Sequence, residues 1–306
     1  MLLSIIIPFY NVELYIEECL RSCLNQNIPY DEYEILCIDD CSPDNSKDIV
    51  RNLQKDNKNI VLLEHIENRK QGGARNTGLM NARGEFVWFI DSDDYIYPNV
   101  LNSVLNLAKS NKLDILQFNH TRSEQQINNI HCSEIVSGET YLFKDQNPMW
   151  YDKIIGPWKQ IFRRDFLLEN NLKFIEDSMY EDTDYLLHSF LLAERVQKIS
   201  LSVYFYRSND NSITLSNESP IKLAWQVNQM VRCSRLINLT SSYIGKKCIS
   251  EMISNSLTYL RTTLTYFNLI EKITYVKNLK GDIRLTKDYL SWRTWLAIRY
   301  GITCFI

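Results

Sequence analysis

The chain has 306 residues, of which 45% are hydrophobic and 23% are charged, and its formal net charge is −3. This length is enough for one or two domains with a substantial core, and the composition is that of an ordinary globular protein. The charge balance argues against nucleic acid as the main partner, because proteins that neutralise phosphate backbones usually carry a basic face.

The eight cysteines are scattered and form no CxxC pair, so a structural zinc site is not expected. The opening segment, "MLLSIIIPFYNVE", has no basic stretch, and its apolar run is too short for a signal peptide or a membrane span. We therefore expect reduced thiols and a cytoplasmic protein.

Strands and helices are predicted to alternate along the first 120 residues. Short apolar runs rich in β-branched and aromatic residues predict buried strands, and apolar positions three or four apart predict the helices between them. Strands are predicted at 2–8, 32–39, 59–65, 85–91 and 113–120. Helices are predicted after a cap at Asn11, within 42–56, after a glycine turn at 72–73, and with Pro98 in the first turn. This order predicts an α/β fold with a mostly parallel sheet flanked by helices.

Two acidic clusters directly follow predicted strands. Asp39 and Asp40 end the second strand, and the tetrapeptide "DSDD" at residues 91–94 ends the fourth. Ligands of parallel sheets bind beyond the carboxyl ends of the strands, so both clusters are expected at one edge. Clustered carboxylates are favourable there around a divalent cation. The alternative is that one Asp caps the next helix and the others are solvated.

Several well-known ligand motifs are absent. The sequence has no GxGxxG after the first strand, no GxxxxGK[ST] and no GxSxG. It does contain "GGARNTG" at residues 72–78, and a glycine turn that opens a helix offers backbone N–H groups to phosphate. Arg75 could then share a diphosphate with the cation.

Six segments, taken in order, resemble family 2 glycosyltransferases. They are "SIIIPFYNVELYIEECLRSCLNQ", "EILCIDDCSPDNS", "GGARNTGL", "ARGEFVWFIDSDD", "WKQIFRRDFL" and "MYEDTDYLL". The resemblance covers about residues 2–215 and implies an inverting enzyme with the Rossmann-like GT-A fold, of a kind that often builds bacterial surface polysaccharides. We accordingly divide the chain into a nucleotide-sugar-binding half at 1–120, an acceptor-binding half at 121–215 and a C-terminal helical region at 216–306.

The resemblance implies the residues of the nucleobase pocket. Pro8 and Tyr10 would line this pocket, with Glu13 beside it. Asp40 would accept a hydrogen bond from the base, typically uracil, and Asp39 would support it.

The resemblance also assigns the residues that face the rest of the donor. Arg75 and Asn76 of the "ARN" motif would face the pyrophosphate or the sugar. Asp91 would face the ribose or the sugar, with Ser92 beside it.

An inverting transfer needs a cation for the departing diphosphate and a base for the acceptor hydroxyl. By resemblance, Asp93 would hold Mn²⁺ or Mg²⁺ with Asp94 as a second contact, and Asp182 would be the base with Glu181 orienting it or touching the acceptor. The alternative for the Glu-Asp pair is that both residues only complement a helix dipole. Asp184 is interpreted as surface charge.

Trp158 and Lys159 match a family segment that often reads Trp-Asn-Lys, and we assign both residues to acceptor binding. Trp158 could stack on a sugar face, and the alternative is ordinary core packing. Arg207 could reach a phosphate of the donor or of a lipid acceptor, and the preferred alternative is a salt bridge at the sheet edge.

The C-terminal region changes character after about residue 216. Long helical patterns replace strands, and the tail at 289–306 alternates aromatic, aliphatic and Arg residues. Such a tail could lie as a peripheral contact on an anionic membrane, or it could simply pack as a helix.

The sequence therefore predicts a metal-dependent inverting glycosyltransferase. The expected donor is a nucleotide-sugar with UDP as the favoured nucleotide, and the expected acceptor is a glycan or lipid-linked glycan. The alternative is an inactive binding or scaffold subunit of a polysaccharide-assembly complex. A nucleotidyltransferase ranks last, because the segment after the first strand, "PFYNVELYIEE", is acidic rather than phosphate-binding.

Overall fold

The computed structural model describes residues 1–122, 140–141 and 156–208, together with scattered positions between 225 and 249. The chain forms two compact units. The first contains residues 1–143, 156–177 and 192–212, and the second contains 144–155, 178–191 and 213–306. The predicted boundaries near residues 120 and 215 remain a prediction.

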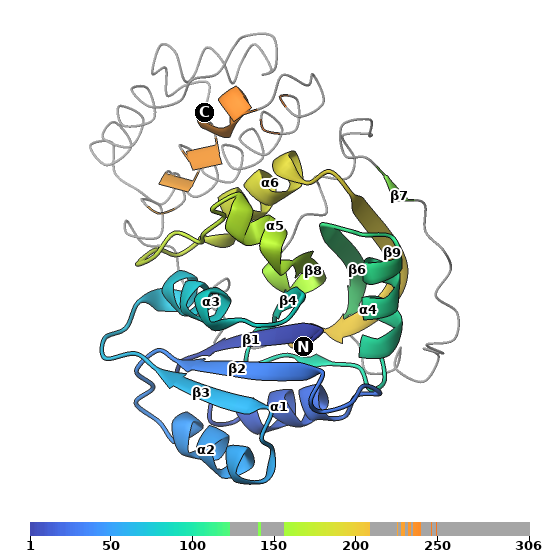
Figure 1. Cartoon of the computed structure of the whole chain (residues 1–306). Coiled ribbons are helices and arrows are strands. Elements are labelled where there is room, and N and C mark those ends of the chain that lie inside the picture. The colour runs from blue at the N-terminus through green and yellow to red at the C-terminus, as the bar shows by residue number, and fades with distance from the viewer. Residues whose placement is uncertain are drawn as a thin grey trace, which may run out of the picture. The chain divides into compact units, whose positions relative to one another are not determined.

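A mixed β-sheet forms the centre of the first unit (Figure 1). Within the described residues its strand order is β3-β2-β1-β4-β8-β6-β9-β5, and β7 pairs with β9. The strands are β1 (Leu3–Phe9), β2 (Tyr33–Asp39), β3 (Ile60–Glu64), β4 (Phe86–Phe89), β5 (Tyr95–Ile96), β6 (Ile115–Thr121), β7 (Thr140–Tyr141), β8 (Gln160–Arg163) and β9 (Val196–Phe205). The helices are α1 (Ile16–Leu24), α2 (Ser46–Asp56), α3 (Lys70–Asn81), α4 (Leu101–Ser110) and α5 (Arg164–Glu169), with a 3-10 turn η4 (Pro157–Lys159).

The predicted parallel arrangement is confirmed for β3, β2, β1 and β4. The rest of the sheet is mixed: β8 runs antiparallel to both β4 and β6, β9 runs parallel to β6, and β5 runs antiparallel to β9. Because β5 has two residues and β8 has four, neither is long enough to carry a readable alternation of apolar and polar residues.

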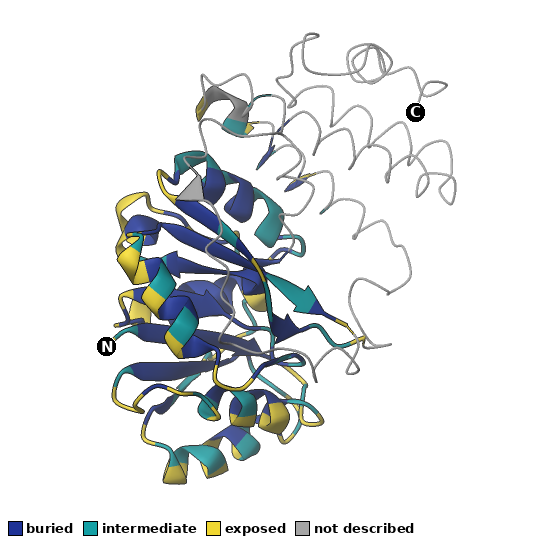
Figure 2. Cartoon of the chain, turned by 90° about the vertical axis from the view of Figure 1, so that its right-hand side faces the viewer, coloured by how far each residue is buried: buried dark blue, intermediate teal, exposed yellow. Residues whose placement is uncertain are grey.

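Helices on both faces explain why β1 is a continuous apolar run. Ile5 and Ile7 join the same hydrophobic cluster as Ile16 and Cys19 of α1. Ile6 points the other way, toward α3, as the period of two along a strand requires. All of β1 is therefore buried, and Figure 2 shows the same for its neighbours.

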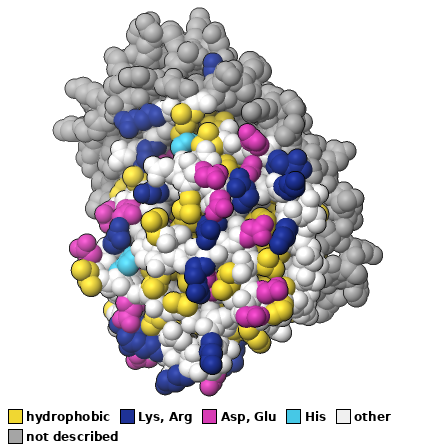
Figure 3. Space-filling model, in the orientation of Figure 1, with side chains coloured by type: hydrophobic (Ala, Val, Ile, Leu, Met, Phe, Trp, Pro, Cys, Tyr) yellow, Lys and Arg dark blue, Asp and Glu magenta, His cyan; other side chains and the backbone are white. Residues whose placement is uncertain are grey.

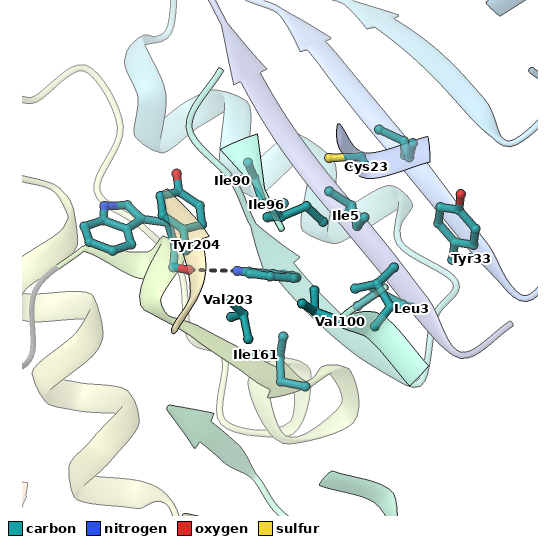
Figure 4. Close-up of a cluster of buried hydrophobic side chains, with 14 of the residues drawn as sticks. Leu3, Ile5, Cys23, Tyr33, Ile90, Ile96, Val100, Ile161, Val203 and Tyr204 are labelled. Atoms are coloured by element: carbon teal, nitrogen blue, oxygen red, sulfur yellow. Dashed lines mark hydrogen bonds between the residues drawn. The ribbon is translucent and has the colours of Figure 1, made fainter. Parts of the chain in front are cut away.

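One hydrophobic core joins the parallel and mixed parts of the sheet. Figure 4 shows Leu3 and Ile5 of β1 together with Ile161 of β8 and with Val203 and Tyr204 of β9. Strands that are distant in sequence therefore depend on one another for burial.

Three predicted helix starts are wrong. The α1 helix begins at Ile16, so Asn11 does not cap it. The α3 helix begins at Lys70, so the glycines at 72–73 lie inside its first turn rather than in a turn before it. The α4 helix begins at Leu101, three residues after Pro98. Before α1 and α4 the chain makes a further turn, whereas α3 begins earlier than predicted.

The predicted core role of two thiols is confirmed, since Cys19 and Cys23 are fully buried. All cysteines in the described part of the chain are free.

The second unit is described at fewer positions. It contains residues 182–191 of α6 (Asp182–Leu192) and a 3-10 turn, η6 (Leu236–Leu239). The described positions between 225 and 249 are helical, as predicted, whereas the tail at 289–306 lies outside the described residues. No helix among the described residues is both long and apolar enough to cross a membrane.

Charged side chains of both signs are interspersed over the face of the molecule in Figure 3. On the described part of that face neither sign forms a continuous patch.

Candidate active site

The two acidic clusters lie on either side of β1 at one edge of the sheet. In the parallel register, Phe9 of β1 is opposite Asp39 of β2, and Ile6 is opposite Phe89 of β4. The backbone N–H of Asp40 donates to the carbonyl of Phe9 at 3.0 Å, which holds the chain beside β1 just beyond the strand. The predicted meeting of the acidic strand ends is therefore confirmed.

Asp39 and Asp40 have different surroundings although both are buried. The Asp39 carboxylate accepts the backbone N–H of Ser42 at 2.9 Å and lies 3.7 Å from Lys47 Nζ, so it organises the turn that enters α2. Asp40 Oδ1 accepts a hydrogen bond from His65 Nδ1 at 2.8 Å. Asp39 thus supports the local backbone, and its support of a nucleobase contact at Asp40 remains a prediction.

The loop after β1 contains the other predicted nucleobase residues. Pro8 lies within β1 and is buried, whereas Tyr10 is half exposed. Glu13 Oε2 accepts the backbone N–H of Asn45 at 3.0 Å and its side-chain amide at 2.9 Å. Glu13 therefore ties this loop to the start of α2, and among the predicted nucleobase residues of the loop Tyr10 has an exposed ring that a ligand can reach.

Arg75 of α3 pairs with the first carboxylate after β4. Its Nη2 lies 2.7 Å from Asp91 Oδ1, and its guanidinium carbon lies 5.3 Å from the ring centre of Phe174. The Arg75 side chain is 2% exposed, so this pair is well shielded from water. Arg75 and Asp91, which were each predicted to face the donor, are thus brought together.

Asn76 makes its described contacts with a neighbouring loop. Its amide nitrogen donates to the Phe174 carbonyl at 2.9 Å and to Glu176 Oε1 at 3.0 Å, and its oxygen accepts the Phe174 N–H at 2.9 Å. The hydrogen bond from Asn76 and the ion pair with Arg69 lower the pKa of Glu176. Through these contacts Asn76 holds residues 174–176 against α3. A contact of Asn76 with the donor remains a prediction.

Asp93 and Asp94 follow one another in sequence but lie in different environments. Asp94 is 2% exposed; its Oδ2 accepts the Tyr204 hydroxyl at 2.6 Å and its Oδ1 accepts the Arg207 N–H at 2.8 Å. Burial, and then the charges of Asp91 and Asp93, raise the pKa of Asp94 to about 8. Asp93 is only half buried, and its carbonyl accepts from Arg207 Nε at 2.9 Å.

This arrangement fits a cation at Asp93 better than at Asp94, because both Asp94 oxygens already have protein donors. Among the described residues, no group of three His, Cys, Asp or Glu side chains is placed to hold a metal ion. A cation at Asp93 would need further oxygen ligands, which a bound diphosphate can provide. Arg207 also pairs with Glu18, as the salt-bridge alternative predicted.

Trp158 lies in an aromatic cluster rather than on an open face. It is 4% exposed, its ring stacks on Tyr204 with centres 4.7 Å apart, and His120 meets it edge-on at 4.9 Å. Lys159 is likewise 5% exposed. These contacts support core packing for Trp158, while acceptor contacts for Trp158 and Lys159 remain a prediction.

The Glu-Asp pair lies in the second unit. Glu181 is buried, and Asp182 is the first residue of α6, following Tyr180, whose φ of 58° is unusual for a residue with a side chain. The interpretation of Asp184 as surface charge is wrong: its Oδ2 accepts from Arg232 Nε at 3.0 Å, and both side chains are 18% exposed. Burial raises the pKa of Asp184 despite this partner.

Sequence reasoning missed two residues that contact the acidic strand ends. His65, which bonds to Asp40, belongs to no motif, although it directly follows β3 at the same sheet edge. Tyr204, which bonds to Asp94, lies in the segment "YFYR", of which only Arg207 is among the candidates above. The position of His65 after a parallel strand was the available signal.

The model of the family described as "Glycosyl transferase family 2" matches residues 4–169. The uncharacterized glycosyltransferase EpsJ of Bacillus subtilis is 33% identical over 234 residues, covering 73% of this chain and 65% of EpsJ. A poly(ribitol-phosphate) beta-glucosyltransferase of Bacillus spizizenii is 34% identical over 214 residues, covering 67% of this chain and 32% of that protein. The chain thus matches less than two thirds of the length of either relative.

Solved structures are similar in fold. TarS of S. aureus, residues 1–349 in complex with UDP-GlcNAc, superposes with a TM-score of 0.80 at 23% identity, covering 98% of this chain and 87% of that one. The mannosyltransferase PcManGT of Pyrobaculum calidifontis, in complex with GDP-Man and Mn²⁺, gives a TM-score of 0.56 at 17% identity, covering 99% and 85%. The predicted α/β GT-A fold is confirmed by the likeness to TarS.

Proposed function

The chain belongs to glycosyltransferase family 2, and we propose that it transfers a sugar from a UDP-sugar to a hydroxyl of a glycan or lipid-linked glycan acceptor. We further propose that it acts in the synthesis of a bacterial surface polymer and inverts the anomeric centre. The name of the Bacillus spizizenii relative, a poly(ribitol-phosphate) beta-glucosyltransferase, supports a surface polymer as the product. The complex of TarS with UDP-GlcNAc supports uridine in the donor, with glucose or N-acetylglucosamine as the sugars to test first.

The observation that carries this proposal is the shared edge formed by β2, β1 and β4. Asp40 lies beyond β2 and Asp91 beyond β4, so one ligand between them can meet carboxylates from two strands. Arg75 holds Asp91 in place from α3. Asp40 would then receive the base, while Asp91 would accept hydroxyls of the ribose or the sugar.

Asp93 is the residue that we assign to Mn²⁺ or Mg²⁺. When bound, such a cation would supply positive charge for the departing diphosphate. Asp94 fixes this turn, because its carboxylate accepts hydrogen bonds from the Tyr204 hydroxyl and from the Arg207 backbone N–H. Arg207 adds a second anchor through the Asp93 carbonyl.

Asp182 is the residue that we propose as the general base. It would take the proton from the acceptor hydroxyl as that oxygen attacks the anomeric carbon. It is the first residue of α6, a position where a helix readily accommodates an acidic side chain.

The first experiment is calorimetric titration of UDP, GDP and dTDP into the protein, with Mn²⁺ and with EDTA. We expect UDP to bind in the presence of Mn²⁺, and Asp93→Ala to weaken that binding at least about tenfold, as loss of one charged ligand should. Asp48→Ala, which changes an exposed carboxylate on α2, is the matched control. A well-folded protein that binds none of these nucleotides would overturn the proposal.

The second arm measures release of UDP from UDP-glucose and UDP-GlcNAc with candidate acceptors. Asp182→Asn should keep nucleotide binding and lose turnover by about 100-fold or more, because a positioned base contributes that much. Binding without turnover in the wild-type chain, whichever acceptor is supplied, would instead support the binding-subunit alternative.

A further inference from the structure

His65, the residue after β3, is fixed at both ring nitrogens. Its Nδ1 lies 2.8 Å from Asp40 Oδ1, and its Nε2 lies 2.8 Å from Thr77 Oγ1 on α3. The side chain is 7% exposed, and the backbone N–H donates to the Asp39 carbonyl at 2.9 Å. The ring is therefore held by the sheet on one side and by α3 on the other, and it has little freedom to turn.

The two contacts determine the direction of the hydrogen bonds. The Asp40 carboxylate can only accept, so His65 Nδ1 carries the proton and donates it. In the neutral ring Nε2 must then accept, and the Thr77 hydroxyl is the donor placed to serve it. The result is a chain of two hydrogen bonds: Thr77 donates to His65, and His65 donates to Asp40.

This chain leaves one oxygen of Asp40 for a ligand. Oδ1 also accepts the Arg69 backbone N–H at 2.8 Å, so it receives two donors. The Asp40 carbonyl accepts from Asn68 Nδ2 at 2.9 Å, which fixes the backbone as well. Within the described part of the chain Oδ2 has no hydrogen-bond donor, and the rest of the side chain cannot rotate without breaking both bonds to Oδ1.

We propose that His65 and Thr77 are positioning residues that set nucleobase specificity by holding Asp40 with Oδ2 as a fixed acceptor. This inference rests on the proposed function, in which Asp40 receives the base. A fixed acceptor selects bases that present a ring N–H, namely N3–H of uracil or thymine and N1–H of guanine. It rejects cytosine and adenine, whose corresponding ring nitrogens are acceptors and would face a carboxylate oxygen with no proton between them.

The test compares the dissociation constants of UDP and CDP by calorimetry with Mn²⁺. The wild-type chain should prefer UDP. His65→Leu, which removes both ring nitrogens, should lower that preference at least about tenfold, since a buried hydrogen bond to a charged group is lost. Thr77→Val should lower it by a smaller factor, because His65 keeps its bond to Asp40 but loses the donor that fixes the ring.

Two conservative variants serve as matched controls. His65→Asn places an amide N–H₂ near the position of Nδ1 and should largely restore the preference, and Thr77→Ser keeps the hydroxyl and should match the wild type. Thermal unfolding of each variant separates loss of stability from loss of discrimination. A merely structural role would change the unfolding temperature and leave the ratio of the two dissociation constants unchanged.

The outcomes separate this inference from the proposed function. If the wild-type chain binds no nucleotide, the proposed function fails and this inference fails with it. If UDP binds but His65→Leu and Thr77→Val keep the wild-type ratio, the inference alone is overturned. If His65→Leu does not fold, the test rests on Thr77→Val. A ratio of the UDP and CDP dissociation constants in that variant equal to the wild-type ratio overturns the inference.

Discussion

At the scale of single residues, neighbours in sequence take opposite roles in this protein. The string "DSDD" offers its carboxylates as equivalent candidates, yet Asp94 turns inward to Tyr204 and Arg207 while Asp93 stays half exposed. No local pattern distinguishes them, because the difference comes from β9, about 110 residues later in the chain. The gathering of carboxylates at this edge was predictable from the sequence, and the difference between the environments of Asp93 and Asp94 was not.

His120 provides a pH-dependent prediction at the same scale. Burial, and then the charges of Lys159 and Arg122, lower the pKa of His120 to about 4. Between that value and the ordinary pKa of about 6.5, the unfolded chain binds a proton that the native chain does not. The free energy of unfolding should therefore fall as the pH is lowered from about 6.5 to about 4. Above this window His120 is neutral in both states, so it should no longer make stability depend on pH.

The measurement is urea unfolding at about pH 7 and about pH 5. His120→Phe, which keeps a ring against Trp158, should lose less stability than the wild-type chain between these two values. An equal loss in both proteins would show that His120 does not cause the pH dependence.

At the scale of elements, α3 depends on an unusually close approach to the sheet. A Cβ added at Gly78 would lie 2.3 Å from Ile6 Cγ2 and 3.0 Å from Ile38 Cδ1, and both isoleucines are fully buried. The glycine therefore lets α3 lie against β1 and β2, which in turn brings Arg75 and Thr77 to the strand ends.

Gly78→Ala should lower the free energy of unfolding by about 1–3 kcal/mol, because overpacking outweighs the better helix propensity of Ala. The measurement is urea unfolding, with Met80→Ala at an exposed position of the same helix as the control. Combined with Ile6→Ala, which removes the Cγ2 that the added Cβ would meet, the Gly78→Ala cost should shrink. A Gly78→Ala protein as stable as the wild type would refute the close-packing argument.

The strands that the sequence predicts well are those buried on both faces, such as β1 and β2, because their apolar runs are continuous. Helix starts are predicted less well. The residues between a strand end and the next helix, such as Asn11 with its φ of 56°, form turns that depend on tertiary contacts as well as on local sequence. The candidate site is built on these turns. The strand ends that carry its residues were therefore predictable, whereas the hydrogen bonds that those residues make were not.

At the scale of the whole molecule, a buried carboxylate joins three distant segments of the first unit. Asp114, just before β6, accepts Arg163 Nη2 at 2.8 Å and Nε at 3.1 Å from the end of β8. It also accepts the backbone N–H groups of Glu194 at 2.9 Å and Arg195 at 3.1 Å, just before β9. The Asp114 carboxylate thus links the ends of β6, β8 and β9 in the mixed half of the sheet.

Asp114→Ala should lower the free energy of unfolding by about 1–3 kcal/mol, because it leaves two backbone N–H groups and the Arg163 guanidinium without this acceptor. Asp114→Asn should cost less, since its amide oxygen can still accept. Urea unfolding measures both changes, and Asp165→Ala, at an exposed carboxylate nearby in sequence to Arg163, is the control. A loss below about 1 kcal/mol for Asp114→Ala would contradict this role.

The strand order also has a consequence for the protein while it is being synthesised. The strands β1 to β4 are complete once residue 89 has left the ribosome, but β8, which covers the open side of β4, is not made until residues 160–163. At about 5–20 residues per second, the nascent chain would expose an unpaired hydrophobic strand edge for several seconds. The order of the strands therefore creates an interval in which the growing chain is exposed to aggregation and in which a chaperone would protect it.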